Sequence, residues 1–179
     1  RRLLTLIEDI IRLSRLDEGV RGEVTPVDLT ALIQHCVQKL TPAAQNAQVS
    51  ISASGNDPVL ISGDHALLEE MLTNLLENGI KYNHAGGYVR ARAEMADGRA
   101  VVTVADNGVG IAPEDQQRVF ERFYRVDKSR SKQTGGTGLG LSIVKHGAQV
   151  HHAQIAMQSA LGEGTTITLT FPAQSSGKK

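Results

Sequence analysis

The strongest constraint on the fold is a pair of β-hairpin patterns with a long, glycine-bounded stretch between them. The segments "YVRARAEM" and "AVVTVA" alternate apolar and polar residues around "ADGR", and "HAQIAMQSA" and "TTITLTF" alternate around a "GEG" turn. Such alternation predicts two hairpins. Residues 107–137 between them show little periodicity, so we expect a long loop with one helical turn near "EDQQRVF". A loop of about 30 residues inside a compact domain is usually functional, and the glycine clusters at both of its ends suit a lid.

Helices and short strands are predicted around these hairpins. Asp28 and Asp64 are side chains of the type that caps helix N-termini. They precede helical patterns over about 29–46, with an expected kink at Pro42, and over about 65–82. The remaining elements are a helix from about Gly138 to Val150 and two short strands, "VSISA" and "PVLIS". In this order the elements predict a mixed sheet covered on one face by helices, an α/β two-layer sandwich.

The opening segment, "RRLLTLIEDIIRLSRLDEG", predicts a helix without an evident partner in this chain. Its apolar residues recur at helical spacing, at Leu3, Leu6, Ile7, Ile10, Leu13 and Leu16. Gly19 is the expected helix stop. One helix of about 18 residues cannot bury such a stripe alone. Because the chain opens abruptly in this pattern, we expect it to be a fragment of a longer protein.

Composition limits the classes of function. The chain has 179 residues with 19 basic and 19 acidic side chains, and its formal net charge of zero argues against broad non-specific nucleic-acid binding. Cys36 is the only cysteine, so an intrachain disulfide is impossible and a reducing compartment is expected. No apolar run approaches the roughly 20 residues of a membrane span.

The glycine-rich segment "QTGGTGLGLSIVKH" opens the predicted helix after the loop. Free N–H groups and positive partial charge at a helix N-terminus suit a phosphate chain. The segment is not a P-loop, because no G-K-[ST] follows at the required spacing, and it lacks the βαβ setting of a dinucleotide fingerprint. Protein-kinase HRD and DFG signatures are also absent. From these residues alone, a flexible linker remains an alternative.

The segment "NLLENGIKYN" places polar side chains along one stripe of the long predicted helix. Asn74, Asn78 and Lys81 follow one another at i, i+4 and i+7, and the leucines face the other side. Mg²⁺ takes hard oxygen ligands such as an amide carbonyl, and lysine is a point charge for phosphate oxygens. The stripe therefore suits a metal–phosphate site, although a solvated helix face would have the same pattern.

The segment "DNGVGIAPED" begins where a strand ends. Asp106 would project a carboxylate into a pocket there, and Gly108 and Gly110 would let the backbone come close to a bound ring. A carboxylate that accepts from the N6 amine of adenine would select it over guanine, which presents a carbonyl instead. The alternative is an ordinary Asp-Asn-Gly turn.

Together and in this order, these segments resemble the catalytic and ATP-binding domain of bacterial sensor histidine kinases. That domain belongs to the gyrase/heat-shock chaperone/histidine kinase/mismatch-repair ATPase superfamily. "NLLENGIKYN" resembles the N box, "DNGVGI" the G1 box, "FERFYR" the F box and "GGTGLGLSIVK" the G2 box, and "GEGTTITLTFP" resembles the strand that follows. The implied fold is the Bergerat-type ATP-binding fold. The implied divisions are a dimerisation and histidine-phosphotransfer helix over 1–20, a linker over 21–26, the catalytic domain over 27–172 and a polar tail over 173–179.

The resemblance also implies a role for each matching residue. Asn78 is the implied Mg²⁺ ligand with Asn74 close by, Lys81 contacts phosphate, Tyr82 lines the nucleotide site and Asp106 binds the adenine amine. The other implied nucleotide contacts are Gly108, Gly110 and Ile111 on the G1 side, and Thr137, Gly138, Leu139, Gly140 and Leu141 on the G2 side. Three lid cations are positioned to reach the γ-phosphate: Arg125, Lys128 and Arg130. Phe120 and Phe123 are expected to pack the lid, residues 112–136, which we expect to be mobile without nucleotide.

The implied activity is transfer of the ATP γ-phosphoryl to a histidine, with catalysis assigned to Asn78, Lys81, Arg125 and Arg130 through positioning and charge neutralisation by Mg²⁺ and cations. The family's acceptor histidine is followed by an acidic residue, and none of the six histidines here is. We therefore expect the acceptor on an absent helix, from which the phosphoryl passes to a response regulator receiver domain. The parent is expected to be a homodimer anchored in the bacterial inner membrane, with this chain as a cytoplasmic domain.

Two other functions remain open on the sequence. One is a serine kinase of the anti-sigma-factor type, built on the same superfamily but without need of the leading helix. The other is a binding module that holds ATP and signals by the position of its lid without chemistry.

Overall fold

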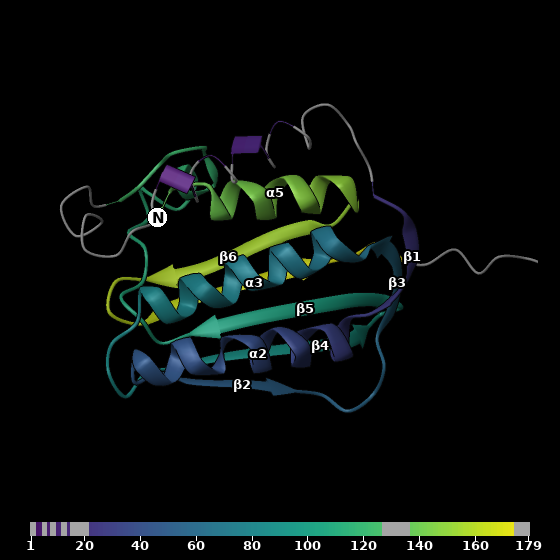
Figure 1. The fold of residues 1–179 in the computed structure, drawn as a ribbon, viewed down its shortest axis with the longest axis horizontal. Coiled ribbons are helices and arrows are strands. Elements are labelled where there is room, and N and C mark those ends of the chain that lie inside the picture. The colour runs from purple at the N-terminus through teal and green to yellow at the C-terminus, as the bar shows by residue number, and fades with distance from the viewer. Residues whose placement is uncertain are drawn as a thin grey trace, which may run out of the picture.

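The computed structural model describes residues 22–126 and 137–173, and six earlier positions that have helical conformation: Leu3, Leu4, Ile7, Ile10, Ile11 and Ser14 (Figure 1). In chain order the first elements are β1 (Val24–Asp28), α2 (Leu29–Asn46), β2 (Ser50–Ser54), β3 (Leu60–Asp64) and α3 (His65–Lys81). They are followed by β4 (Tyr88–Ala96), β5 (Arg99–Asp106), η1 (Arg118–Phe120), α5 (Gly140–Val150), β6 (Gln154–Ala160) and β7 (Gly164–Thr170).

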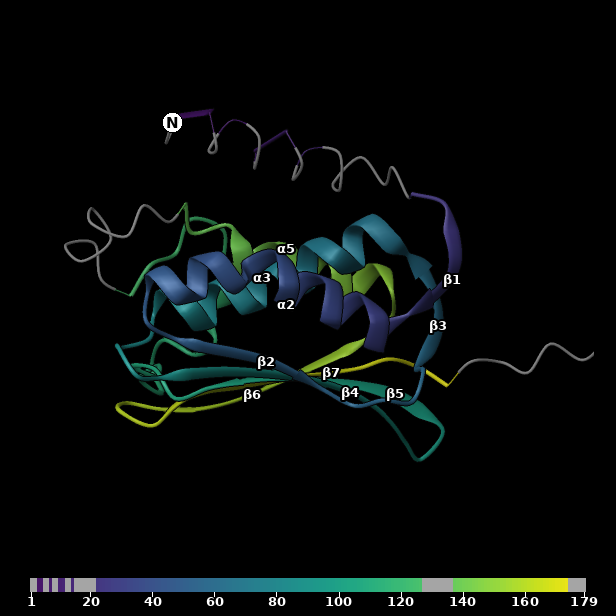
Figure 2. The same cartoon turned by 60° about the horizontal axis from the view of Figure 1, so that its bottom comes forward.

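A five-stranded sheet forms one of the two layers. Its strand order is β2-β4-β5-β7-β6, with β2 parallel to β4 and the other neighbours antiparallel. Figure 2 shows α2, α3 and α5 together on one face of this sheet. The predicted α/β two-layer sandwich, with a mixed and mostly antiparallel sheet, is confirmed.

The helix caps form where the sequence predicts them. The Asp28 carboxylate accepts from the backbone N–H groups of Thr30 and Ala31 at the start of α2, and the Asp64 carboxylate accepts from Leu67 N–H at 3.1 Å. Each satisfies N–H groups that have no partner within the helix. The helix α2 continues through Pro42 to Asn46.

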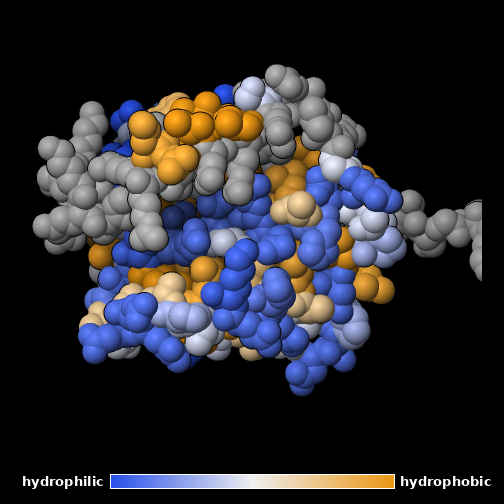
Figure 3. Space-filling model, viewed as in Figure 1, coloured by the Kyte–Doolittle hydropathy of each residue, from blue (hydrophilic) through white to orange (hydrophobic). Residues whose placement is uncertain are grey.

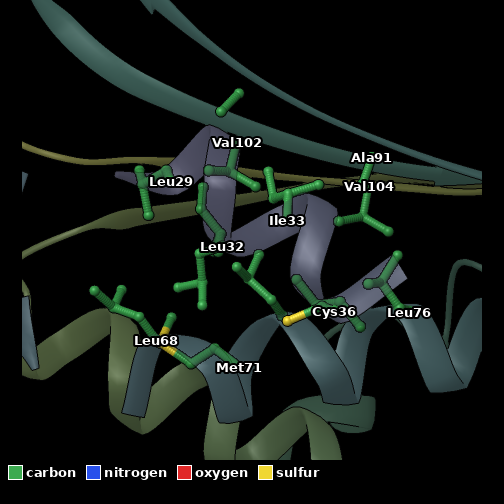
Figure 4. Packing of buried hydrophobic residues seen from close by; sticks show 14 of the residues in the cluster. Leu29, Leu32, Ile33, Cys36, Leu68, Met71, Leu76, Ala91, Val102 and Val104 are labelled. Atoms are coloured by element: carbon green, nitrogen blue, oxygen red, sulfur yellow. The ribbon is translucent and has the colours of Figure 1, made fainter. Parts of the chain in front are cut away.

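An aliphatic core lies between the helices and the sheet. Figure 4 shows Cys36 and Met71 on the helix side of this core and Val102 and Val104 of β5 on its sheet side, and all four are buried. Burial raises the pKa of the Cys36 thiol. Apolar burial of this kind stabilises the fold by roughly 25 cal/mol per Å². The core thereby fixes α3 against β5, and Figure 1 shows that both end on the same side of the domain.

The strand β1 corrects one expectation. Residues 21–26 read as a linker in the sequence, but Val24–Asp28 forms a strand that pairs antiparallel with β3, with Pro26 opposite Ser62. The strands β2 and β3 form as predicted, with somewhat shifted bounds, yet they do not share a sheet. Instead, β3 pairs with β1 in a separate two-stranded sheet, and β2 lies at the edge of the large one.

The described positions before Gly22 expose a group of apolar side chains. Leu3 is 70% exposed, and Leu4, Ile7, Ile10 and Ile11 are also exposed. Figure 3 shows an apolar group at the top of the view, where the N-terminal residues lie in Figure 1. The expectation that the opening stripe lacks a partner is met at these positions, whereas Leu6, Leu13 and Leu16 lie outside the described residues.

Within the part of the chain that the structure describes, no helix combines the length and the apolar character needed to cross a membrane.

Candidate functional site

Asp106 lies at the end of β5, opposite Val89 of β4 and Thr165 of β7. Its Oδ1 atom accepts from Gly108 N–H at 2.8 Å and from Thr165 N–H at 3.3 Å. The described residues provide no donor to Oδ2. Burial raises the pKa of this carboxyl, while the two backbone hydrogen bonds oppose that rise. The site thus holds a half-buried carboxylate whose second oxygen can accept from another molecule.

The glycines after Asp106 allow a close approach of three backbone segments. Gly110 has a φ of 69°, in the left-handed region, and a Cβ at this position would overlap the Ala160 carbonyl. Gly108 lies against the carbonyl of Tyr82 in the same way, and that carbonyl accepts from Val109 N–H at 3.0 Å. Neither position has room for a larger side chain. The segment 106–111 is therefore held between the end of α3 and the β6–β7 turn.

Two polar residues that no sequence motif indicated hold this segment from outside. Ser159 of β6 accepts from Ile111 N–H through its Oγ at 2.8 Å. Gln116 donates from Nε2 to the Ile111 carbonyl at 3.1 Å and to the Ser159 carbonyl at 2.9 Å. In the sequence, Ser159 is only a serine within an alternating strand pattern. Such serines are too common to predict a contact with the segment after Asp106.

The polar stripe of α3, Asn74, Asn78 and Lys81, lies in the C-terminal half of that helix, which ends on the same side of the domain as β5 (Figure 1). Asn74 donates from Nδ2 to the Glu70 carbonyl at 3.0 Å, which fixes its amide. The half-buried Asn78 makes no side-chain hydrogen bond with the described residues. Lys81 Nζ lies 5.2 Å from the centre of the Tyr82 ring. The stripe presents amide oxygens and one ammonium side by side.

The start of α5 meets this stripe directly. A Cβ on Gly140 would lie 2.9 Å from Asn74 Oδ1. The N-cap residue, Leu139, is fully buried, and no side chain caps this helix, in contrast to α2 and α3. Helix N-termini with uncapped N–H groups bind anions. The uncapped start of α5 thus lies next to the Asn74 amide, where its free N–H groups could hold an anion.

The two stems of the loop between β5 and α5 are joined. Phe123 donates its N–H to the Gly138 carbonyl at 2.9 Å, and a Cβ on Gly138 would lie 2.9 Å from the Phe123 carbonyl carbon. Gly138 has a φ of 77°, which favours glycine. Of the expected mobile lid over 112–136, the part up to Phe123 is therefore anchored to the domain.

Arg125 follows this junction, and the carbonyl of the preceding Tyr124 lies 3.1 Å from the position of a Cβ on Gly138. Burial raises the pKa of the Tyr82 hydroxyl, and the positive charge of Arg125 opposes that rise. A hollow of ≈ 410 Å³ on this stem is lined by Arg118, Glu121, Arg122, Phe123, Tyr124 and Arg125. Phe123 is 56% exposed, whereas Phe120 is half-buried.

The predicted site residues fall into three sets in the structure. The first set makes contacts with neighbouring segments around the ends of α3 and β5 and the start of α5: Asn74, Lys81, Tyr82, Asp106, Gly108, Gly110, Ile111, Gly138 and Gly140, with Arg125 directly after the Tyr124 carbonyl that lies against Gly138. Asn78, Thr137, Leu139 and Leu141 lie on the same elements or beside them. Lys128 and Arg130 lie outside the described residues. The arrangement combines a half-buried carboxylate, amide side chains, cationic side chains and an uncapped helix start.

Comparisons with known proteins match this arrangement to one family. The family model described as histidine kinase-, DNA gyrase B- and HSP90-like ATPase matches residues 63–175. The sensor-like histidine kinase SenX3 of Mycolicibacterium smegmatis is 42% identical over 172 residues, which are 96% of this chain and 45% of that protein. The chain thus spans less than half the length of this relative.

Two solved structures share the fold. Full-length ShkA in complex with AMPPNP superimposes with a TM-score of 0.83 at 29% identity, over 95% of this chain and 35% of that one. The mycobacterial sensor histidine kinase MprB superimposes with a TM-score of 0.71 at 29% identity, over 85% of this chain and 99% of that one.

Proposed function

Because the chain belongs to the family of histidine kinase-, DNA gyrase B- and HSP90-like ATPases, we propose that it is the ATP-binding, phosphoryl-donating domain of a two-component sensor histidine kinase. The observation that carries the proposal is the meeting of three elements at one end of the domain. They are the Asp106 carboxylate, the polar stripe of α3 and the uncapped start of α5 at Gly140. Each would meet a different part of one ATP molecule.

The base would lie at Asp106. The Oδ2 atom would accept from the adenine N6 amine, while Oδ1 stays engaged with Gly108 and Thr165. Guanine presents a carbonyl at the same place, and a carbonyl facing a carboxylate is repelled. The proposal therefore includes selection of ATP over GTP. Tyr82 and Ile111 would line the ring.

The phosphates would lie between α3 and α5. The N–H groups at the start of α5 around Gly140 and Leu141 would donate to phosphate oxygens. Lys81 and Arg125 would neutralise the charge that develops on the transferred group, as in phosphoryl transfer generally. Lys128 and Arg130 are proposed to do the same from the lid.

Mg²⁺ fits the amide of Asn78. Among the described residues no three His, Cys, Asp or Glu side chains come together to hold a metal, so Asn78 would share the ion with the phosphates and water. This is the ligand set that Mg²⁺ prefers. When bound, the ion neutralises phosphate charge and orients the phosphate chain. Asn74 stays in place through its bond to Glu70 and would support the phosphates nearby.

The acceptor histidine is proposed to lie outside this chain. His84 has both ring nitrogens within hydrogen-bond distance of carbonyls, at Ala85 and Asn107. His151 lies between Asp64 N–H and the Gly147 carbonyl. Both rings serve the fold, and neither is followed by an acidic residue. A histidine-bearing helix of a homodimeric parent would therefore receive the phosphoryl and pass it to a receiver domain.

Labelling with γ-labelled ATP tests this division of roles. The chain alone should bind Mg·ATP and remain unlabelled, and addition of a histidine-bearing helix pair from a full-length sensor histidine kinase should produce label on that pair. The label should be acid-labile and alkali-stable, as phosphohistidine is. Acid-stable label would favour a serine kinase, and absence of label with tight ATP binding would favour a binding module. Acid-labile label on the isolated chain would contradict the external acceptor.

A further inference from the structure

The stem of the loop after β5 is closed by a side-chain pair that neither the motifs nor the comparisons assign. The Tyr124 hydroxyl donates to Asp115 Oδ1 across the short helix η1. Asp115 is itself fixed, because its N–H donates to the Ala112 carbonyl at 2.9 Å and its carbonyl accepts from Val119 N–H at 2.9 Å. The hydrogen bond to Asp115 raises the pKa of Tyr124, so the hydroxyl keeps the proton that it donates.

The tyrosine ring is also held on its face and through its backbone. The Arg118 guanidinium lies 4.2 Å from the ring centre. The preceding residue, Phe123, has a φ of 63° and donates its N–H to Gly138. A left-handed φ at a non-glycine residue is unfavourable and persists only where the surroundings fix it. The Tyr124–Asp115 and Phe123–Gly138 hydrogen bonds are two contacts that hold the chain on either side of this residue.

Arg125 comes directly after this fixed tyrosine. The carbonyl of Tyr124, directly before it, lies 3.1 Å from the position of a Cβ on Gly138, two residues before the start of α5. The positive charge of Arg125 also lowers the pKa of the Tyr82 hydroxyl at the end of α3. The Tyr124 hydroxyl is bonded to Asp115, and the backbone just before Tyr124 is bonded to Gly138. These two bonds fix the direction of the chain at Arg125 before any nucleotide binds. A fixed backbone direction favours binding through this long side chain, because less of its conformational freedom is then lost when the nucleotide binds.

We propose that Tyr124 is a positioning residue, which with Asp115 forms a latch that aims Arg125 at the γ-phosphate side of the nucleotide site. This inference rests on the proposed ATP-binding function and adds a residue pair to it. The latch acts through Arg125 alone and does not contact the nucleotide. It should therefore affect ligands with a third phosphate and leave ligands with two phosphates unaffected.

The test compares AMPPNP and ADP binding, with Mg²⁺, to the whole 179-residue chain. Tyr124→Phe should weaken AMPPNP about three- to tenfold, as loss of one hydrogen bond does, and change ADP less than about twofold. Asp115→Ala should do the same, whereas Asp115→Asn keeps an acceptor oxygen and should restore most of the AMPPNP affinity. Arg125→Ala should weaken AMPPNP binding by a similar factor. The double variant Arg125→Ala with Tyr124→Phe should bind AMPPNP no more weakly than Arg125→Ala alone.

Tyr88→Phe is the matched control. The Arg90 guanidinium lies 4.1 Å from the Tyr88 ring centre, so this variant also removes a hydroxyl from an arginine-stacked tyrosine. It should leave both affinities unchanged. An equal loss of AMPPNP and ADP in Tyr124→Phe, or additive losses in the double variant, would overturn the positioning role.

Hydrogen–deuterium exchange gives a second measurement that needs no nucleotide. Tyr124→Phe should speed exchange in the segment 118–126 while the core strands stay protected. Unchanged exchange there would overturn the latch. If the unmodified chain bound neither nucleotide, the proposed function would fall, and the exchange result would still decide whether the latch exists.

Discussion

Gly140, the first residue of α5, lies directly against Asn74 of α3. A Cβ on Gly140 would lie 2.9 Å from Asn74 Oδ1, so the contact has space for a hydrogen atom but not for a methyl group. This contact joins the anion-binding start of one helix to the amide stripe of another. Gly140→Ala should push the two apart and weaken Mg·ATP binding by about tenfold, or ~1.4 kcal/mol. Titration calorimetry measures this loss.

The thermal unfolding midpoint is the control for Gly140→Ala. Alanine forms helix better than glycine by about 1 kcal/mol, so the variant should unfold at the same or a higher temperature. Weaker ATP binding together with a lower unfolding temperature would mean that α5 as a whole was disturbed, and unchanged binding would remove the contact from the site.

Gly79 should resist replacement by alanine although it lies inside a helix. A Cβ there would lie 2.9 Å from both γ carbons of Val89 on β4. Overpacking of this kind costs about 1–3 kcal/mol, which outweighs the gain of about 1 kcal/mol in helix propensity. Urea unfolding should therefore show Gly79→Ala to be less stable than the parent.

Val89→Ala supplies the matched background for that experiment. With the γ carbons removed, Gly79→Ala should raise the free energy of unfolding by about 1 kcal/mol relative to Val89→Ala alone. A stabilising effect of Gly79→Ala in the unmodified chain would contradict the tight α3–β4 contact.

The carboxyl of Asp106 should make the domain less stable as pH rises. Burial raises its pKa in the folded chain, so the folded state holds this proton to a higher pH than the unfolded state does. Between the two pKa values the free energy of unfolding therefore falls as pH rises, and it stays at the lower value above them. Asp106→Asn removes this ionisation and keeps the Oδ1 acceptor.

The variant should accordingly unfold at a higher temperature than the parent at neutral pH, and the difference should shrink in acid. Unfolding midpoints of both proteins across a pH series check this. A variant that is less stable than the parent by the same amount at every pH would show that the carboxylate is not strained by burial.

The opening segment should cause self-association. Ile7 and Ile10 are 44% and 43% exposed, within the apolar group that includes Leu3. An unpaired amphipathic helix buries such a stripe against another copy or another helix. Ile7→Glu with Ile10→Glu should reduce the mass measured by light scattering or raise the solubility. Arg90→Glu, on the exposed side of β4, is a charge-matched control that should change neither. Equal mass and solubility in the double variant and the parent would count against the prediction.

Local signals made most of the fold predictable. Asp28 and Asp64 cap the first turn of their own helices, and the alternation in a hairpin involves neighbouring residues. The helix starts and the hairpins could therefore be predicted from the sequence. The strand β1 was not, because its partner β3 lies far along the chain and Pro26 argues against a strand. Proline is tolerated here because β1 has a neighbour on one side only.

The candidate site divides in the same way. Asp106 and the glycines after it were predictable, since a carboxylate at a strand end followed by glycines is a local pattern. Gln116 and Ser159 hold that segment through contacts over more than 40 positions, and only the folded chain brings them together. Tyr124 lies in the segment that resembles the F box, but its partner Asp115 lies outside that segment. The hydrogen bond between them could therefore not be predicted from the sequence.

Calorimetric titration of the chain with ATP and with GTP, each with Mg²⁺, tests the central claim most directly. A hydrogen bond to a charged group contributes about 1.5–3 kcal/mol, so ATP should bind clearly better than GTP. Asp106→Asn should weaken ATP roughly 10- to 100-fold and abolish most of that preference. The account would be contradicted if the chain bound ATP and GTP with equal affinity and Asp106→Asn left both affinities unchanged. In that case Asp106 would not select adenine at this end of the domain.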